Sequence, residues 1–159
     1  MLRETILFFH FLGFGTFVAI QLASFILESQ YKKAPDLQTK AIILRALRPI
    51  GLLSPIAIII QLISGIGNMQ MLGYGLLDMG WLTAKIIFFA IAVISGVTMG
   101  IKSRKRGTLV GQMVQGKAPA DAEKLLKEYD KELGRFFLVM PLLLILILCL
   151  SIYGRLGGQ

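Results

Sequence analysis

The sequence has almost none of the residues from which covalent and metal cross-links are built. Cys149 is the only cysteine among 159 residues. A single cysteine excludes a disulfide within the chain and any metal site made of several thiolates. Internal repeats, low-complexity tracts and a soluble domain are also absent from the sequence pattern.

Apolar residues are what the chain has in excess, at 55% of the total. Four stretches are long enough, or nearly so, to cross a hydrocarbon core of roughly 30 Å. The first is too long for the apolar part of a signal peptide, so we expect it to be retained. We predict an all-α fold, a polytopic membrane four-helix bundle that forms one transmembrane domain over 1–159, with helices at about 5–27, 50–72, 81–101 and 136–153.

The net charge of +8 is distributed unevenly along the chain. Fourteen of the seventeen basic residues lie between the first and second or between the third and fourth predicted helices. The positive-inside rule places these two connections in the cytoplasm and both termini outside it, as in a bacterial inner membrane protein. The run "KSRKR", residues 102–106, has no interleaved aromatic residues, so we expect contact with the lipid bilayer and no nucleic acid.

Two stretches within the basic connections have the pattern of short amphipathic helices. In 36–49, Asp36 is suited to cap a helix and apolar residues recur at helical spacing up to Pro49. In 121–134, apolar residues follow the same spacing from an Asp to a Gly. We predict two short cytoplasmic helices that lie on the lipid headgroups, with the docking of a partner as the alternative.

Polar residues of four predicted helices fall at one depth near the outer face of the membrane. These residues are His10, Asn68, Lys85 and Cys149. An ionisable side chain at membrane depth costs roughly 2.5 to 3.5 kcal/mol, so Lys85 needs an explanation. Either Lys85 extends to the outer headgroups, or it pairs with a buried anion. His10 likewise is either a neutral histidine at a helix interface or a ligand.

Several features together resemble a known family. They are a histidine early in the first helix, the Ser54-Pro55 pair followed by Gly65, the sequence "GWLTAK" at 80–85, and Pro141. This pattern resembles the bacterial membrane protoporphyrinogen IX oxidase family (the HemJ type) and its copper-resistance D relatives. The resemblance spans all four helices, and its most specific element is Gly80-Trp81-Leu82-x-x-Lys85.

The resemblance implies a haem b cofactor and a redox function. It implies His10 as the cofactor-binding metal ligand and Lys85 as a catalytic and cofactor-binding residue, and Asn68 lies at the same level. Since His10 is the only histidine, a bound haem needs a methionine, an open position or a residue of another chain on its second side.

Two other functions fit the same sequence. The chain could be a non-enzymatic accessory or scaffold subunit that binds larger membrane proteins or forms a homo-oligomer. It could also handle copper through His10, Cys149, Met69 and Met71, although the two methionines alternate and do not share one helix face.

Overall fold

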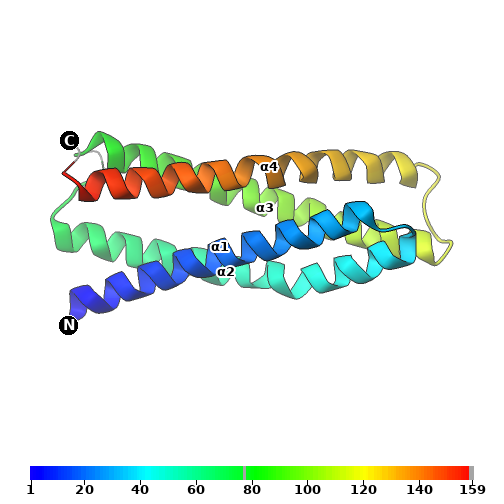
Figure 1. The fold of residues 1–159 in the computed structure, drawn as a ribbon, viewed down its shortest axis with the longest axis horizontal. Helices are drawn as coiled ribbons and strands as arrows, with labels where there is room; N and C mark the ends of the chain where they lie inside the picture. Colours follow the sequence, from blue (N-terminus) through cyan, green and yellow to red (C-terminus); the bar gives the residue numbers. More distant parts are fainter. Residues whose placement is uncertain (77, 158–159) are drawn as a thin grey trace.

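The computed structural model describes residues 1–76 and 78–157, which form four helices joined by short connections (Figure 1). The helices are α1 (Leu2–Lys33), α2 (Leu37–Leu72), α3 (Gly80–Val114) and α4 (Ala122–Arg155). All four are long and apolar enough to cross a membrane. The all-α four-helix prediction is confirmed, and the chain is a small integral membrane protein.

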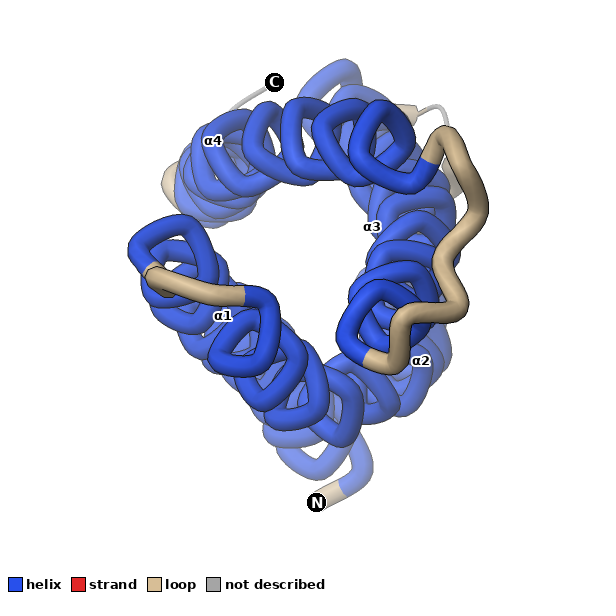
Figure 2. Tube along the Cα trace, turned by 90° about the vertical axis from the view of Figure 1, so that its right-hand side faces the viewer, coloured by secondary structure: helices blue, strands red, loops and turns tan. Residues whose placement is uncertain are grey.

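The helices run up and down, so the two ends of the bundle differ. Both termini and the α2–α3 connection lie at one end, which we call the terminal end (Figure 1). The α1–α2 and α3–α4 connections lie at the other, which we call the basic end and which faces the viewer in Figure 2. Helix α1 packs along α2 and α3 along α4, while α1 and α4 meet over a much smaller area.

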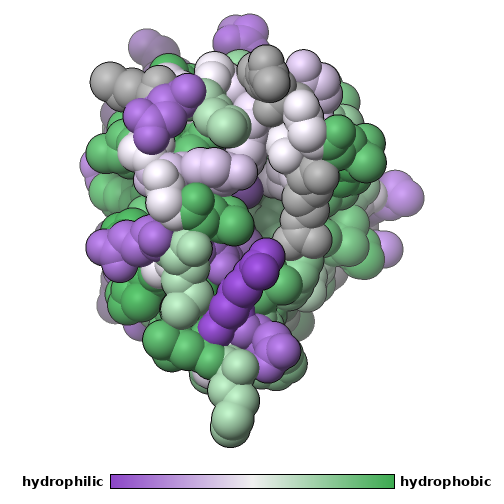
Figure 3. Space-filling model, turned by 90° about the vertical axis from the view of Figure 1, so that its left-hand side faces the viewer, coloured by the Kyte–Doolittle hydropathy of each residue, from purple (hydrophilic) through white to green (hydrophobic). Residues whose placement is uncertain are grey.

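The apolar exterior of the bundle is what a lipid environment requires. Large apolar side chains are exposed along all four helices, for example Ile63 at 69%, Ile94 at 67% and Leu138 at 70%. Figure 3 views the terminal end, where hydrophobic residues lie along both sides with hydrophilic residues among them. Lipid tails satisfy such a surface at no cost, whereas water would not.

The core has two parts, one along the middle of the bundle and one near the basic end. The first contains side chains from all four helices: Phe17, Ile20, Ala57, Ala92, Met140, Leu144 and Ile147. The second fills the basic end: Tyr31, Leu44, Leu47, Leu109, Val110, Ala122 and Leu126. The second part lies around the connections that the sequence assigns to the aqueous side, so the bundle continues beyond the membrane-spanning stretches.

The two amphipathic stretches are not separate helices. Residues 37–49 are the first turns of α2, and 122–134 are the first turns of α4. Leu44 and Leu47 pack against Leu109 and Val110 in the second core, and this burial keeps α2 continuous through Pro49 and Pro55. The prediction that these stretches lie on the headgroups is therefore corrected, because their apolar faces are used inside the bundle.

Candidate functional site

His10 lies on α1 and contacts two side chains of α2. Its Nδ1 atom is 3.1 Å from Ser64 Oγ, and its Nε2 atom is 3.2 Å from Gln61 Nε2. Ser64 Oγ is also 2.6 Å from the carbonyl oxygen of Ile60. The single hydroxyl proton of Ser64 goes to that carbonyl, so the Ser64 oxygen accepts from Nδ1–H. His10 is then the tautomer with a proton on Nδ1 and a lone pair on Nε2, which accepts from the Gln61 amide.

Two glycines lie at this contact between α1 and α2, and the contact at Gly13 is the tighter of the two. A Cβ atom added at Gly65 would lie 3.6 Å from His10 Cε1, so the imidazole packs directly against the α2 backbone. A Cβ added at Gly13 would lie 3.0 Å from Gln61 Oε1 and 3.2 Å from the Gln61 backbone nitrogen. Gln61 thus makes an interhelical contact between α2 and α1 through its amide nitrogen and His10 Nε2.

The other predicted site residues lie on the three other helices. Gly67 faces Ile6 and Gly65 faces His10, so Asn68 lies about one turn nearer the terminal end than the partners of His10. Lys85 lies in the second turn of α3 and is half-buried, as is Asn68. Cys149 is exposed on α4, so the polar layer predicted across four helices does not gather all of its members inside the bundle.

Trp81, the most specific residue of the "GWLTAK" sequence, has a packing role. A Cβ added at Gly154 of α4 would lie 2.6 Å from the Trp81 ring, so the indole lies flat against the α4 backbone. The ring also meets Tyr74 edge to face at 6.5 Å, and its Nε1–H donates to Met79 Sδ at 3.2 Å. Trp81 thereby fixes the start of α3 against the end of α4, one turn before Lys85.

No three of the His, Cys, Asp and Glu side chains in 1–76 and 78–157 are grouped as ligands of one metal ion. His10 has amide and hydroxyl partners, Gln61 and Ser64. An open apolar depression of about 510 Å³ adjoins this site on the outer face of α1 and α2, lined by Ser64 together with Ile6, Phe9, Ile60, Ile63 and Gly67. The site thus combines one imidazole with an apolar surface that faces lipid.

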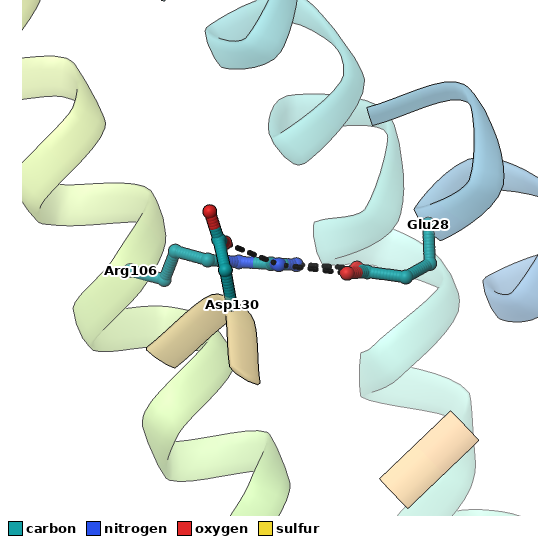
Figure 4. A network of polar contacts seen from close by, with 3 residues as sticks. All are labelled: Glu28, Arg106 and Asp130. Atoms are coloured by element: carbon teal, nitrogen blue, oxygen red, sulfur yellow. Dashed lines mark hydrogen bonds and ion pairs between the residues drawn. The ribbon is translucent and has the colours of Figure 1, made fainter. Parts of the chain in front are cut away.

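A second polar site, which the sequence did not reveal, lies near the basic end (Figure 4). Arg106 of α3 donates from Nη2 to Glu28 Oε2 at 2.6 Å and from Nη1 to Glu28 Oε1 at 2.9 Å. Nη1 also lies 3.1 Å from Asp130 Oδ1 of α4. Arg106 and Glu28 are 0% and 2% exposed, whereas Asp130 is 31% exposed. One guanidinium thus joins three helices.

Tyr31 completes this ion-pair cluster. The Arg106 guanidinium carbon lies 4.2 Å from the centre of the Tyr31 ring, a cation–π distance. The bidentate contact with Glu28 is the geometry for which arginine is suited and lysine is not. The cluster compensates two buried charges and ties α1 to α3 and α4 where α1 and α4 otherwise meet little.

The spacing of Arg106 was the signal that could have identified the cluster. Arg106, Leu109 and Val110 are at i, i+3 and i+4, so the arginine shares a helix face with two apolar residues. Lys102 lies one turn earlier on the same face and pairs with Glu132 of α4. Lipid contact, expected for the whole run 102–106, therefore does not account for Lys102 and Arg106, which pair with carboxylates of other helices, while Arg104 and Lys105 are exposed.

Searches against protein-family models, curated proteins and solved structures found no match to this chain.

Proposed function

We propose that this integral membrane protein binds haem b near the terminal end of the bundle and functions in a redox reaction. The 3.1 Å contact between His10 Nδ1 and Ser64 Oγ is the observation that carries the proposal. Histidines that ligate iron commonly donate the other ring N–H to a fixed acceptor, which sets the tautomer and aims the Nε2 lone pair. Ser64 supplies that acceptor here, and its own proton is held by Ile60.

Gln61 occupies the position that the iron would take on Nε2. Its amide donates to Nε2 at 3.2 Å, while its Oε1 atom is buried without a hydrogen-bond partner. A buried acceptor left unsatisfied costs about 1 to 3 kcal/mol, so the Gln61 amide is not held in this position by a complete set of hydrogen bonds. Two features fit a metal at His10 Nε2 in place of Gln61: the imidazole nitrogen can act as a ligand, and Gln61 Oε1 has no hydrogen-bond partner.

Lys85 and the apolar depression beside Ser64 would bind parts of the cofactor that His10 does not hold. The depression offers an apolar surface next to His10, and Lys85 offers a cation at membrane depth for a carboxylate of the cofactor or of an acidic substrate. Asn68 would contribute a neutral polar group one turn away. When bound, haem supplies one-electron chemistry, and the chain's own residues hold and orient it.

The same contacts favour one other function. Both ring nitrogens of His10 have partners on α2, as expected of a histidine that only joins two helices. In that case the chain is an accessory subunit whose apolar exterior packs against larger membrane proteins. The two functions differ in the haem content that they predict. A haem protein should lose its haem in His10→Ala and keep it in Gln61→Ala, whereas an accessory subunit should contain no haem in the parent protein or in either variant.

Absorption spectra of the purified chain, produced in cells supplied with a haem precursor, test the proposal. We expect a Soret band in the parent protein, its loss in His10→Ala and its retention or increase in Gln61→Ala. Ser64→Ala should shift the reduction potential because Nδ1–H loses its acceptor. Ser151→Ala is the matched control, since Ser151 Oγ–H donates only to Ile147 of its own helix.

The content of cofactor in Lys85→Gln tests the anion pairing. Loss of one partner of a desolvated pair costs about 3 to 5 kcal/mol, so this variant should retain much less cofactor than the parent. A parent protein without haem under these conditions would contradict the proposal and favour the accessory subunit.

A further inference from the structure

The basic run at 102–106 is divided by the fold into two kinds of residue. Lys102 and Arg106 lie one turn apart and are neutralised by Glu132, Glu28 and Asp130 inside the bundle. Arg104 and Lys105 are exposed on another face of α3. Among the residues that the structure describes, neither forms an ion pair with a carboxylate. Two adjacent positive charges are thus left for a partner outside the chain.

Arg104 and Lys105 line a pocket of about 380 Å³ between α3 and α4. The pocket opens widely to the surface, and its volume is large enough for a phosphate and its glycerol. Hydrogen-bonding side chains of α3 and α4 share the lining, which includes Thr108, Gln112 and Tyr129. Two cations with hydroxyl and amide groups around them are the donor set that binds a phosphate ester.

An apolar stripe continues this face of α3 toward the middle of the bundle. Ile94, Val97 and Ile101 follow one another at spacings of three and four residues, and Arg104 and Lys105 come three and four residues after Ile101. These spacings place all five residues along one helix face. Their exposed fractions are 67%, 55% and 53%. The face therefore has an apolar half suited to an acyl chain and a basic half suited to a phosphate.

The level of the pocket agrees with the headgroup layer. Arg104 lies three residues beyond Ile101, the last residue of the predicted apolar span, and at about 1.5 Å per residue this is roughly 4.5 Å. The polar layer on each side of a bilayer is roughly 5 to 8 Å thick. Arg104 and Lys105 thus lie at the depth of lipid phosphates, and Gln112 lies deeper in the aqueous phase.

We infer that the pocket between α3 and α4 at the basic end binds the headgroup of an anionic phospholipid. The phosphate lies between Arg104 and Lys105, the polar end of the headgroup reaches Thr108, and one acyl chain lies along Ile94, Val97 and Ile101. A soluble phosphate ester would use the basic half of this face only, so the apolar stripe selects the lipid.

Native mass spectrometry of the full chain in detergent tests this site. The probes are dioleoyl phosphatidylglycerol, phosphatidylcholine with the same chains, and glycerol 3-phosphate. The parent protein should bind one phosphatidylglycerol in preference to the other two probes. At about 1 kcal/mol per basic residue near a membrane surface, Arg104→Gln with Lys105→Gln should weaken this binding roughly thirtyfold.

A second double variant controls for the loss of net charge. Lys124 and Lys127 are exposed on α4 and do not line the pocket, so Lys124→Gln with Lys127→Gln should change phosphatidylglycerol binding by less than about threefold. Arg104→Lys keeps the charge and should retain most of the binding. Equal weakening by the two double variants would overturn the inference, as would binding of phosphatidylcholine or glycerol 3-phosphate as tight as that of phosphatidylglycerol.

Discussion

Arg106 Nη2 lies 2.6 Å from Glu28 Oε2, and both side chains are almost completely buried although 78 residues separate them. A folded protein with a buried charge that has lost its partner is far less stable than one with the intact pair or with apolar residues at both positions. The Arg106–Glu28 pair is therefore the point in the bundle where a single substitution should have its largest effect.

Arg106→Met should lower the free energy of unfolding by about 3 to 5 kcal/mol, because Glu28 remains buried without a cation. The double variant Arg106→Met with Glu28→Leu should recover part of this loss. Unfolding in mixed micelles with increasing sodium dodecyl sulfate, followed by circular dichroism, measures both. Arg104→Met is the control on the exposed face of the same helix, and a loss equal to that of Arg106→Met would show that burial of the pair contributes nothing.

Gly13 and Gly15 of α1 should respond in opposite directions to replacement by alanine. A Cβ at Gly13 would lie 3.0 Å from side-chain atoms of Gln61 and Ile60 and 3.2 Å from the Gln61 backbone nitrogen, so these neighbours must shift by a few tenths of an ångström in Gly13→Ala, and overpacking of this kind costs about 1 to 3 kcal/mol. A Cβ at Gly15 meets nothing within 4 Å, so Gly15→Ala should stabilise the helix by roughly 0.5 to 1 kcal/mol. The same unfolding assay compares them, and equal effects would contradict the close contact at Gly13.

The orientation of the bundle follows from the basic end. A reporter fused after Gln159 should read as outside the cytoplasm, and one inserted at Gly116, in the α3–α4 connection, should read as inside. The end of α4 and the α3–α4 connection lie at opposite ends of the bundle (Figure 1). If both assignments were reversed, the lipid site would lie in the outer leaflet and His10 near the inner one.

Asp36 should make the start of α2 sensitive to acid. Its carboxylate accepts from the Thr39 amide at 2.7 Å and from the Thr39 hydroxyl at 3.0 Å, and these bonds hold the pKa of Asp36 below the ordinary aspartate value. A lowered pKa means that the cap stabilises the helix above pH of about 4 and that this contribution is lost as the pH falls through the lowered value. Hydrogen exchange of the Thr39 amide, corrected for the intrinsic rate, measures this.

Two variants separate the charge of Asp36 from its capping geometry. Asp36→Ala should remove protection of the Thr39 amide at every pH, whereas Asp36→Asn should leave a weaker protection that does not change with pH. Protection in the parent protein that stays constant down to pH 2 would contradict the role of the carboxylate.

The four spans could be predicted because each depends on a local property, the length of an apolar stretch. The starts of α2 and α4 could not be predicted in this way. In α2, Pro49 by itself favours a helix end, and the burial of Leu44 and Leu47 against α3 keeps the helix continuous. That burial is a contact between distant residues, and one sequence does not reveal it.

The candidate site shows the same division between local and distant information. His10 and Lys85 stand out as rare polar residues in apolar stretches, and the interhelical bond of Gln61 could be expected for a buried amide. Ser64 could not be identified as the partner of His10, because the choice between Ser64 and Asn68 depends on the vertical register of α1 against α2. That register is set by the contacts at Gly13, Gly65 and Gly67.

The separation of Glu28 from Arg106 also bears on the order of events during synthesis. The ribosome adds roughly 5 to 20 residues per second, so Arg106 is made about 4 to 16 s after Glu28. Throughout that interval the Glu28 carboxylate lacks Arg106, its partner in the finished bundle, and is solvated by water or paired with a basic residue made earlier, such as Arg45 or Arg48. The basic end of the α1–α2 hairpin therefore lacks its final ion pair until α3 is made and Arg106 can pair with Glu28. The contact between Arg106 and Asp130 of α4 forms last.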